Sequence, residues 1–526
     1  MKLVTTQQMR ELDRRASEEG GVPSLLLMEN AGQRVFQVVC GMLGSPTGGR
    51  VAIIAGKGNN GGDGCVVAQN LAKAKADVKV FLLANPDEVG GDAKVNLDVV
   101  IRNRIPLTVV STSEDIPDLR DFDLIVDAIL GTGIRGEVTD LAADGIRAIN
   151  ESGRPALAVD VPSGIDADTG AICGVCVKAD ATVTFALPKR GLFLYPAIEC
   201  VGDLTIADIG IPRHILDDSG SKVSLITPEL VAALLPKRAR DAHKGDFGHL
   251  AVLAGSVGMT GAAALAAESA LRVGTGLVTL GVPESLNDIL EVKVTEVMTL
   301  PIPESGNRCF GPKSAEASLE LVERCDAAAI GPGVGRRQET AEYVREILPK
   351  IQKPMVIDAD GLNALSENME TFRELRAPTV ITPHPGELAR LTGTSASDIQ
   401  SKRLEIAAEC AARWNVIVVL KGAATVIAEP SGEIFVNATG NPGMASGGVG
   451  DVLTGAIGGF LAQGLKPLDA AVCGVYLHGL AGDLAACDLG EAGMIAGDVL
   501  RALPEAIMQV TFGEVSPPFQ EMGAES

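Results

Sequence analysis

The chain has 526 residues, and because domains hold about 150 residues each, its length predicts two large domains or three ordinary ones. Its formal net charge of -22, without a basic arm or stripe, argues against nucleic acid or an anionic membrane surface as a partner. The first ten residues lack the apolar core of a signal peptide, and no uncharged apolar run approaches the roughly 20 residues of a membrane span, so we expect a cytoplasmic protein.

The first 210 residues predict a parallel sheet covered by helices on both faces. Short apolar, β-branched runs alternate there with helix-like stretches, which is typical of strands buried on both faces. We therefore expect a Rossmann-like, three-layer α/β/α domain whose binding site lies beyond the carboxyl ends of the strands. The expected strands are Arg50–Ala55, Val78–Leu83, Asp123–Asp127, Ala156–Asp160 and Ala181–Phe185.

Polar segments follow three of these strands. The glycine-rich turn Gly56–Gly64 contains two Asn and one Asp, Asp127 leads into the glycine loop Gly131–Gly136 with Arg135, and Asp160–Asp166 ends the next strand. Each segment alone could be a turn or a helix cap, because Asp and Asn favour both. Because three such segments follow equivalent strand ends, together they predict a polar pocket. This pocket would suit a hard cation, sugar hydroxyls or phosphate.

These segments resemble the NAD(P)H-hydrate epimerase domain over about residues 1–215. The resemblance implies a substrate in which water has added to C6 of the nicotinamide ring of NADH or NADPH. It also implies a potassium ion held by Asn60, Asp127 and Ser163, and makes Asp160 the acid/base residue. The residues implied to bind the hydrate are Asn59, Asn60, Gly61, Gly62, Asp63, Gly131, Thr132, Gly133, Ile134, Arg135, Gly136, Glu137 and Asp160.

The chemistry of epimerisation gives Asp160 a specific task. To interconvert the R and S hydrates, C6 has to become planar, by loss of the hydroxyl or by ring opening, before oxygen adds to the other face. A carboxylate at C6 could move the proton in both directions, which is our hypothesis for Asp160. A binding module that only senses nucleotides is the alternative, and the intact set Asn60, Asp127, Asp160 and Ser163 argues against it.

The ten cysteines are scattered along the chain, which is typical of buried thiols in a reducing compartment. Cys173 and Cys176 have C-x-x-C spacing in a hairpin-like segment. No second pair follows at the distance of a zinc ribbon, so we interpret these two residues as structural.

A polar, turn-rich segment from Gly210 to Val223 separates this series of strands from a second one. We place the boundary near residue 222, which gives domains at 1–222 and 223–514, followed by a frayed tail at 515–526. The second domain is expected to contain another α/β sheet, with strands at His249–Ala254, Leu277–Val282, Ala327–Ile330, Met355–Asp358, Thr379–Thr382 and Val416–Leu420.

The glycine-rich run Asn441–Asp451 is the most informative segment of the second domain, because it leads directly into the apolar, helix-like stretch Val452–Leu461. Glycines let successive backbone N–H groups converge on an anion at a helix N-terminus, where the helix dipole favours phosphate. Asp451 is then placed to take a proton from a substrate hydroxyl beside that phosphate. A flexible loop ending in a capping Asp is the alternative.

Other polar segments accompany this run. Asp358 and Asp360 end a strand and either hold magnesium or form a capped turn. His384 lies between two prolines after the strand Thr379–Thr382, where it could hold one edge of a substrate. The remaining segments are Lys421–Thr425, Ile330–Gly335, Lys244–Gly248 and Thr260–Ala264.

Together these segments resemble the ribokinase-like superfamily and, within it, the ADP- or ATP-dependent NAD(P)H-hydrate dehydratases, over about residues 225–510. The resemblance implies a ribokinase-like α/β sheet, ADP rather than ATP as phosphoryl donor, and Mg²⁺. It also implies that the hydrate contacts Ala262, Gly335, His384 and Asp451. The nucleotide is implied to bind Lys421, Gly422, Ala423, Ala424, Thr425, Asn441, Pro442, Gly443, Met444, Ala445, Ser446, Gly447, Gly448, Val449 and Gly450.

Hydroxide is a poor leaving group, so phosphorylating the C6 hydroxyl would let phosphate depart in its place and regenerate NAD(P)H. Asp451 would deprotonate that hydroxyl while the glycine nest neutralises charge on the transferred group. The alternative is a ribokinase-like enzyme that phosphorylates a small alcohol such as a vitamin precursor, with an attached nucleotide-sensing domain. We expect NADHX, NADPHX and ADP as partners, where X denotes the hydrate, and the resemblance implies a homo-oligomer.

Overall fold

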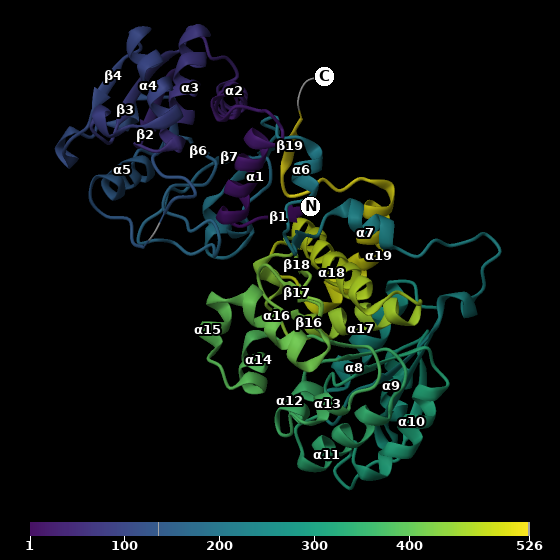
Figure 1. The fold of residues 1–526 in the computed structure, drawn as a ribbon. Helices are drawn as coiled ribbons and strands as arrows, with labels where there is room; N and C mark the ends of the chain where they lie inside the picture. Colours follow the sequence, from purple (N-terminus) through teal and green to yellow (C-terminus); the bar gives the residue numbers. More distant parts are fainter. Residues whose placement is uncertain (135, 524–526) are drawn as a thin grey trace. The chain divides into compact units, whose positions relative to one another are not determined.

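The computed structural model describes residues 1–134 and 136–523, and it has an α/β fold divided into two compact units (Figure 1). The N-terminal unit holds Lys2–Val223 and Pro517–Ser526, and the C-terminal unit holds Met1 and Ser224–Ser516. Each unit contains one mainly parallel sheet, as the alternation of strands and helices predicts. Arg135, a predicted substrate contact, lies outside the described residues.

The N-terminal sheet is parallel throughout, in the order β19-β8-β7-β6-β5-β2-β3-β4. The chain leaves β2 towards β3 on one side and later returns to β5 on the other, so the carboxyl ends of β2 and β5 form a switch point where α/β sheets bind ligands. The strands of this sheet are β2 (Arg50–Ala55), β3 (Asp77–Leu82), β4 (Leu107–Val109), β5 (Leu124–Ala128), β6 (Ala156–Val159), β7 (Ala181–Phe185), β8 (Asp203–Ala207) and β19 (Gln520–Met522), and the two-residue strand β1 (Lys2–Leu3) is not part of it.

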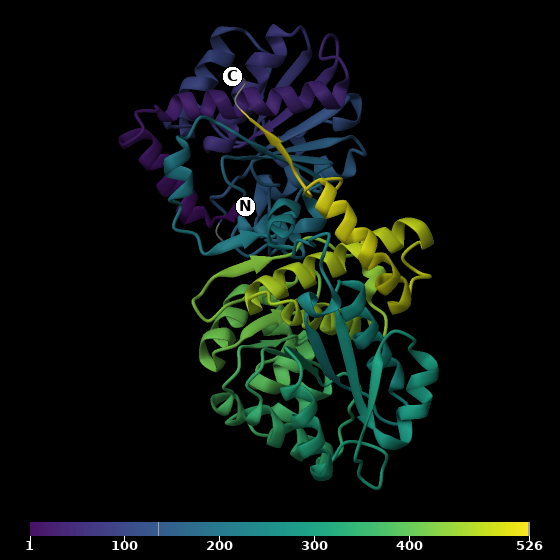
Figure 2. The same ribbon diagram turned by 90° about the vertical axis from the view of Figure 1, so that its right-hand side faces the viewer.

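Helices cover this sheet on both faces, which confirms the three-layer expectation. Apolar side chains of the first four helices pack with Val51 and Ile53 of β2, whereas Ile146 and Ile149 of α5 pack with Ala52 and Ile54 on the opposite face. The long purple helix α2 crosses the strands in Figure 2. The helices are α1 (Thr6–Glu18), α2 (Ser24–Leu43), α3 (Asn59–Lys73), α4 (Gly91–Arg102), α5 (Asp140–Glu151) and α6 (Arg213–Asp217).

The described part of the C-terminal segment, residues 515–523, is not a frayed tail, which corrects that part of the expectation for residues 515–526. Gln520–Met522 forms β19, which pairs in parallel with Thr205–Ala207 of β8 at one edge of the N-terminal sheet. Asp208 N also donates to Met522 O at 3.0 Å. Backbone pairing with a strand more than 300 residues earlier leaves no periodic signal in so short a segment.

The C-terminal sheet runs in the order β9-β18-β17-β16-β15-β14-β13-β10-β11-β12. From β10 to β16 all neighbours are parallel, and β17 and β18 add an antiparallel hairpin that the sequence pattern did not predict. The strands are β9 (Val223–Leu225), β10 (His249–Leu253), β11 (Leu277–Pro283), β12 (Met298–Ile302), β13 (Ala327–Ile330), β14 (Met355–Ile357), β15 (Thr379–Ile381), β16 (Ile417–Leu420), β17 (Val426–Ala428) and β18 (Ile434–Val436).

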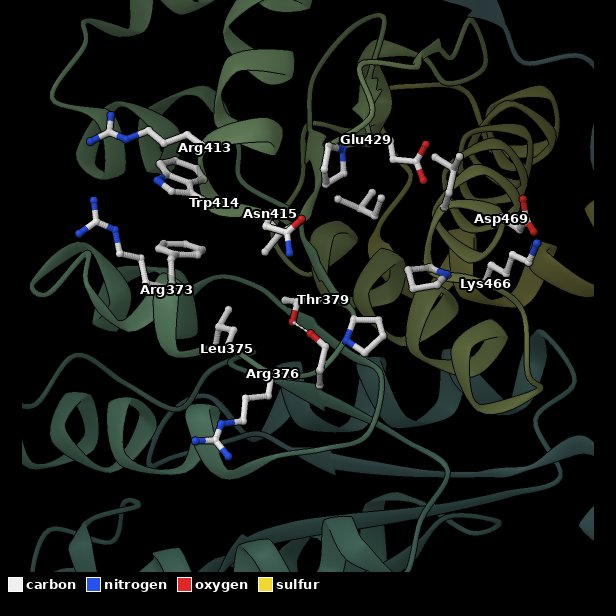
Figure 3. A pocket seen from close by; sticks show the side chains of 18 residues that line it. Arg373, Leu375, Arg376, Thr379, Arg413, Trp414, Asn415, Glu429, Lys466 and Asp469 are labelled. Carbon is white, nitrogen blue, oxygen red and sulfur yellow. Dashed lines mark hydrogen bonds between the residues drawn. The ribbon is translucent and has the colours of Figure 1, made fainter.

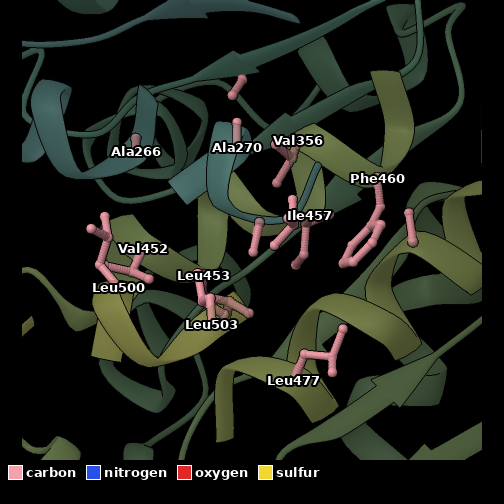
Figure 4. Close-up of a cluster of buried hydrophobic side chains, with 14 of the residues drawn as sticks. Ala266, Ala270, Val356, Val452, Leu453, Ile457, Phe460, Leu477, Leu500 and Leu503 are labelled. Carbon is pink, nitrogen blue, oxygen red and sulfur yellow. The ribbon is translucent and has the colours of Figure 1, made fainter. Parts of the chain in front are cut away.

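Helix α17 (Val449–Ala462) is the centre of the main core of this unit. Its side chains pack against Ala266 and Ala270 of α8, Val356 of β14 and Leu503 of α19 (Figure 4). Glycines permit this approach: a Cβ at Gly455 would lie 1.9 Å from Ala266 O. The other helices are α7 (Pro228–Leu234), α8 (Thr260–Arg272), α9 (Asn287–Lys293), α10 (Ala315–Glu323), α11 (Gln338–Ile347), α12 (Asp360–Ser366), α13 (Thr371–Glu374), α14 (Pro385–Thr392), α15 (Ala396–Ser401), α16 (Arg403–Trp414), α18 (Pro467–Leu489) and α19 (Ala496–Phe512).

Among the described residues, α18 is the one helix whose length and composition would allow it to cross a membrane. Its most apolar window is 78% buried inside the unit, where Leu477 and its neighbours pack on α17. The apolar character of α18 is thus accounted for by its place in a protein core.

Candidate active sites

The three predicted potassium ligands lie together in the N-terminal unit. Ser163 Oγ lies 2.6 Å from Asp127 Oδ1, and Ser163 N donates to Asp127 Oδ2 at 2.8 Å. Leu130 joins the group to the glycine turn, because its N–H donates to Ser163 Oγ at 2.8 Å and its carbonyl accepts from Asn60 Nδ2 at 3.0 Å. The strands β2, β5 and β6 therefore converge here through the loops that follow them.

Asp127 is fully buried in this group. Burial raises its pKa to about 6, although hydrogen bonds from Ser163 and Ile129 act in the opposite direction. A carboxylate, a hydroxyl and an amide, with the Leu130 carbonyl beside them, are the oxygen donors that hard cations prefer. A monovalent cation would offset the cost of burying this negative charge, so the donor set fits potassium.

Asp160 lies at the end of β6 and has a positive φ of 64°, which is strained for a residue with a side chain. Its carboxylate forms an ion pair with Lys189 and accepts from Thr184 Oγ1 at 3.1 Å. The Lys189 side chain is only 1% exposed. These contacts fix the orientation of the predicted acid/base residue.

Two further carboxylates surround this ion pair. Burial and the nearby charge of Asp160 raise the pKa of Asp63 well above its usual range. Burial also raises the pKa of Asp13, on α1, to about 6. Neither Asp13 nor Lys189 is among the residues predicted from the sequence. Asp13 lies in a charged helical stretch typical of a solvated face, while Lys189 follows β7, whose carboxyl end could have indicated it.

A cavity of about 720 Å³ follows the carboxyl ends of β2, β3, β4 and β5. The ion pair between Lys57 and Glu88, with 2.9 Å between Nζ and Oε2, lies at its edge. Asp160 is not part of the lining. Of the predicted contacts, the cavity is lined by Asn59, Asn60, Gly131, Thr132, Gly133 and Ile134.

Among the predicted glycines outside the cavity lining, Gly61 and Gly62 have close protein contacts, whereas a Cβ at Gly136 would meet nothing within 4 Å. A Cβ at Gly61 would lie 1.9 Å from Gly56 O, and a Cβ at Gly62 would lie 2.8 Å from Met28 Sδ. Glu137, which follows Gly136, packs on Gly174 instead of lining the cavity. Glycine is therefore required at 61 and 62 by packing.

In the C-terminal unit, the predicted glycine nest lies at the start of α17. Gly448 has a φ of 94° and caps the helix, and Asp451 lies in its first turn. Asp483 of α18 holds the beginning of the loop, because its carboxylate accepts from Gly440 N at 2.9 Å and from Asn441 Nδ2 at 3.0 Å. Buried His478 contacts Val449 O at 2.9 Å, and burial lowers its pKa to about 4, so it is neutral at pH 7.

Lys421 lies beside this helix N-terminus. Its Nζ is 2.7 Å from Asp358 Oδ1 and 3.8 Å from Glu387 Oε2. Burial opposes the charge, yet these carboxylates raise the pKa of Lys421 above its usual value. Burial and the charge of Asp358 also raise the pKa of Asp451 to about 7, which suits a general base working near neutral pH.

The carboxylates of Asp358 and Asp360 both have protein partners in this structure. Asp358 accepts from Lys421 at one oxygen and from Thr454 Oγ1 at the other, at 2.7 Å each. Asp360 accepts from Gly335 N at 3.0 Å and from Arg336 Nε at 3.1 Å. Within residues 1–134 and 136–523, no group of three or more His, Cys, Asp or Glu side chains could hold a metal ion.

The remaining predicted contacts in the C-terminal unit line the same end of the sheet. His384 caps α14, and its Nδ1 accepts from Gly386 N at 3.0 Å. Gly335 has a φ of 93° and belongs to a loop that lies close to Ala262. A Cβ placed on Gly333 of this loop would be 3.1 Å from Ala262 Cβ. The loops after β13, β15 and β16 thus gather beside α8 and α17.

A second cavity, of about 820 Å³, lies at the opposite ends of the strands, next to Thr379 and Ile417 (Figure 3). Trp414 and Phe372 stack on one side of it, with 4.8 Å between ring centroids. None of the predicted site residues belongs to its lining. We therefore place the candidate active site of the C-terminal unit at α17.

Comparisons with known proteins match this division of the chain. The sequence model of the NAD(P)H-hydrate dehydratase family matches residues 250–505, and that of the YjeF-related protein N-terminus matches residues 24–191. The bifunctional NAD(P)H-hydrate repair enzyme Nnr of Moorella thermoacetica is 47% identical, over 96% of this chain and 96% of its own length. Its Escherichia coli counterpart is 36% identical, over 95% of this chain and 92% of its own length.

Among solved structures, the ADP/ATP-dependent NAD(P)H-hydrate dehydratase from Bacillus subtilis, co-crystallized with ATP/Mg2+, is 33% identical. The match covers 55% of this chain and 99% of the Bacillus subtilis chain, with a TM-score of 0.49. The expectation of two α/β domains, the second matching the NAD(P)H-hydrate dehydratase family, is confirmed.

Proposed function

The chain belongs to the family of bifunctional NAD(P)H-hydrate repair enzymes, and we propose that its N-terminal unit interconverts the R and S hydrates of NADH and NADPH while its C-terminal unit dehydrates the S hydrate with ADP as phosphoryl donor. The observation that carries the proposal is the position of Asp451 in the first turn of a helix behind a glycine nest, where burial raises the pKa of its carboxyl group to about 7. This arrangement serves a reaction in which a hydroxyl loses its proton to become phosphorylated.

In the dehydratase reaction, Asp451 takes the proton of the C6 hydroxyl. The freed oxygen attacks the terminal phosphorus of ADP, AMP departs, and Lys421 and the backbone N–H groups at the start of α17 stabilise the charge on the transferred group. The C6–O bond then breaks, with the electron pair leaving on phosphate and the ring nitrogen supplying electrons. Loss of a proton from C5 completes the double bond, so the products are NAD(P)H, AMP and phosphate.

Mg²⁺ is proposed to enter this site with the nucleotide. Magnesium in nucleotide sites is held largely by phosphate oxygens and water, with only one or two carboxylates from the protein. The carboxylates of Asp358 and Asp360 already have protein partners, so we assign neither residue to the metal. The task of Asp358 is instead to hold Lys421 beside the helix N-terminus.

In the epimerase reaction, Asp160 moves the proton that accompanies departure and return of the C6 oxygen. The ion pair with Lys189 and the hydrogen bond from Thr184 hold its carboxylate in one orientation. Asn60, Asp127 and Ser163 would hold potassium, which supplies a fixed positive charge beneath the glycine turn. We assign substrate binding to the cavity residues and Asp160, with Gly61 and Gly62 shaping the turn.

Both activities concern one metabolite, because the epimerase converts the R hydrate into the S hydrate that the dehydratase consumes. We assign epimerisation to residues 1–222 and dehydration to residues 223–514, with residues 515–526 attached to the former unit. The cytoplasmic location and the homo-oligomeric state stay predictions. The expected absence of nucleic-acid and membrane partners stays a prediction too.

The test supplies mixed R and S hydrates with ADP, Mg²⁺ and K⁺ and follows the absorbance of reformed NADH. We expect complete conversion by the wild type, conversion of the S half alone by Asp160→Asn, and none by Asp451→Asn. Asp469→Asn is the control, since Asp469 lies at the second cavity. A phosphorylated product that accumulates would indicate a kinase of small alcohols instead, and no conversion by the wild type would overturn the proposal.

A further inference from the structure

Two buried thiols are in contact in the N-terminal unit. Cys176 Sγ lies 3.4 Å from Cys200 Sγ, and the two residues are 6% and 4% exposed. Cys200 ends the 3-10 helix η5 (Ala197–Cys200), and Cys176 lies in the loop between β6 and β7. All ten cysteines are free, and among the described residues this is the one thiol–thiol contact.

The partner of Cys176 is therefore not Cys173, its neighbour in the C-x-x-C spacing. Cys173 is half-buried, and its N–H donates to Gly164 O at 2.8 Å. The segment of Cys176 is instead linked to that of Cys200, because Ala179 N donates to Cys200 O at 3.0 Å. This backbone bond keeps the two sulfurs close despite the 24 residues between them.

We propose that Cys176 and Cys200 form a modification site, at which a small peroxide converts the two thiols into one reversible disulfide. The S–S bond is about 2.05 Å long, so the sulfurs have to approach each other by about 1.4 Å. Disulfides in reducing compartments are mostly transient and redox-sensing, which is the behaviour expected of a pair held reduced but in contact.

The reaction begins at Cys200. The hydrogen bond from Cys176 lowers the pKa of Cys200 to about 7, and the charge of Lys178 acts in the same direction. The Cys200 thiolate attacks one peroxide oxygen and the O–O bond breaks, which gives a sulfenic acid and one water once the leaving oxygen is protonated. Cys176 then attacks the sulfenic sulfur and a second water leaves, so two thiols and one hydrogen peroxide yield one disulfide and two waters.

Closure of this disulfide would disturb the proposed potassium site. Val177 N, one residue after Cys176, donates to Ser163 O at 2.8 Å. The contact between the two segments leaves no free space, since a Cβ at Gly164 would lie 1.9 Å from Val175 O. Movement of Cys176 towards Cys200 therefore shifts the backbone that supports Ser163. This consequence rests on the proposed epimerase function, and we expect epimerisation to fall about tenfold.

The experiment treats the full-length wild type with hydrogen peroxide under native conditions, blocks remaining thiols with N-ethylmaleimide and maps peptides without reductant. We expect a Cys176–Cys200 peptide pair that dithiothreitol removes, and no such pair in Cys200→Ser or Cys176→Ser. Cys173→Ser is the matched control and should still form the pair. Cys176→Ala and Cys200→Ala replace the serine variants if a buried hydroxyl prevents folding.

Failure to find the linked peptides, or a link between Cys173 and Cys176, overturns the proposal. The peptide map requires no activity, so it decides the disulfide even if the reduced enzyme fails to epimerise, which would count against the proposed function alone. In an active enzyme, peroxide should slow epimerisation in the wild type and Cys173→Ser but not in Cys200→Ser. A mapped disulfide with an unchanged rate would overturn its coupling to Ser163.

Discussion

Lys421 Nζ lies 2.7 Å from Asp358 Oδ1, and Asp358 is 1% exposed, so a nearly inaccessible carboxylate at the end of β14 fixes the cation beside the N-terminus of α17, where we propose that the nucleotide binds. Its second oxygen accepts from Thr454 on α17 itself. The strand, the lysine and the helix are thereby locked to one another. Replacing Asp358 should affect both the geometry of this site and the protonation of Asp451.

For Asp358→Asn, we expect the pKa of Asp451 to fall, because the charge of Asp358 is one of the causes that raise it. The acid limb of the dehydratase pH profile should move to lower pH, while kcat falls because Lys421 is no longer held. Loss of a buried ion-pair partner should also lower the free energy of unfolding by about 3 kcal/mol. Asp326→Asn is the control, because Asp326 lies near the surface at the other end of the sheet. An acid limb that does not move in Asp358→Asn would contradict the assignment of this limb to Asp451.

The wild-type dehydratase should lose activity as the pH falls through about 7, because Asp451 has to be ionised to accept the proton of the hydroxyl. The measurement is kcat/KM for the purified S hydrate between pH 5 and 9, with ADP saturating. A profile that stays flat down to pH 5 would show that a different group is the base.

Asp451→Asn should abolish dehydration but stabilise the fold at high pH. The folded-state pKa of Asp451 is raised to about 7, so between about pH 4 and pH 7 the unfolded chain gives up this proton more readily, and the folded state loses stability as the pH rises through that range. Removing the charge should therefore raise the free energy of unfolding at pH 8 by on the order of 2 kcal/mol, with little change at pH 4 where the group is protonated. Thermal unfolding at the two pH values provides the measurement, and equal stabilisation at both would be inconsistent with this account.

Lys189→Met should lower the rate of epimerisation by about 100-fold or more. Dehydration of purified S hydrate should be unchanged. The substitution leaves Asp160, Asp63 and Asp13 near one another without their buried cation, so Asp160 loses both its orientation and its charge partner. Lys178→Met, at an exposed lysine of the same unit, serves as control. Epimerisation at the wild-type rate would exclude Lys189 from the site.

Ser163→Ala should weaken the response of the epimerase to potassium. The hydroxyl lies between Asp127 Oδ1 and the Leu130 amide, so its loss removes one oxygen donor and loosens another. We expect the K⁺ concentration for half-maximal epimerisation to rise about 10- to 100-fold. Ser113→Ala, at an exposed serine, should leave the response intact, and an unchanged requirement in Ser163→Ala would remove this residue from the cation site.

Local patterns were enough to predict the α/β architecture, and they placed the predicted site residues in loops that the structure brings together at the carboxyl ends of the strands. Long apolar strands such as Ile417–Leu420 leave a continuous signal, and polar residues after them converge because parallel strands end at one edge. The hairpin of β17 and β18 was not predicted, although β14 and β15 are equally short. Asp13 and Lys189 come near each other only because a helix and a loop that are distant in sequence meet in the fold. The hydrogen bond from Thr454 to Asp358 likewise joins distant segments, and no pattern near β14 indicates it.

The position of β19 has a consequence for how the chain is made. The last strand of the N-terminal sheet, β19, is synthesised after the entire C-terminal unit. When the rest of the N-terminal unit has emerged from the ribosome, the edge of β8 that pairs with β19 is therefore still unpaired. Until synthesis ends, that edge offers unpaired backbone groups to other chains. An expression fragment that stops at residue 222 would keep this open edge permanently, whereas adding residues 517–523 as a separate peptide should close it.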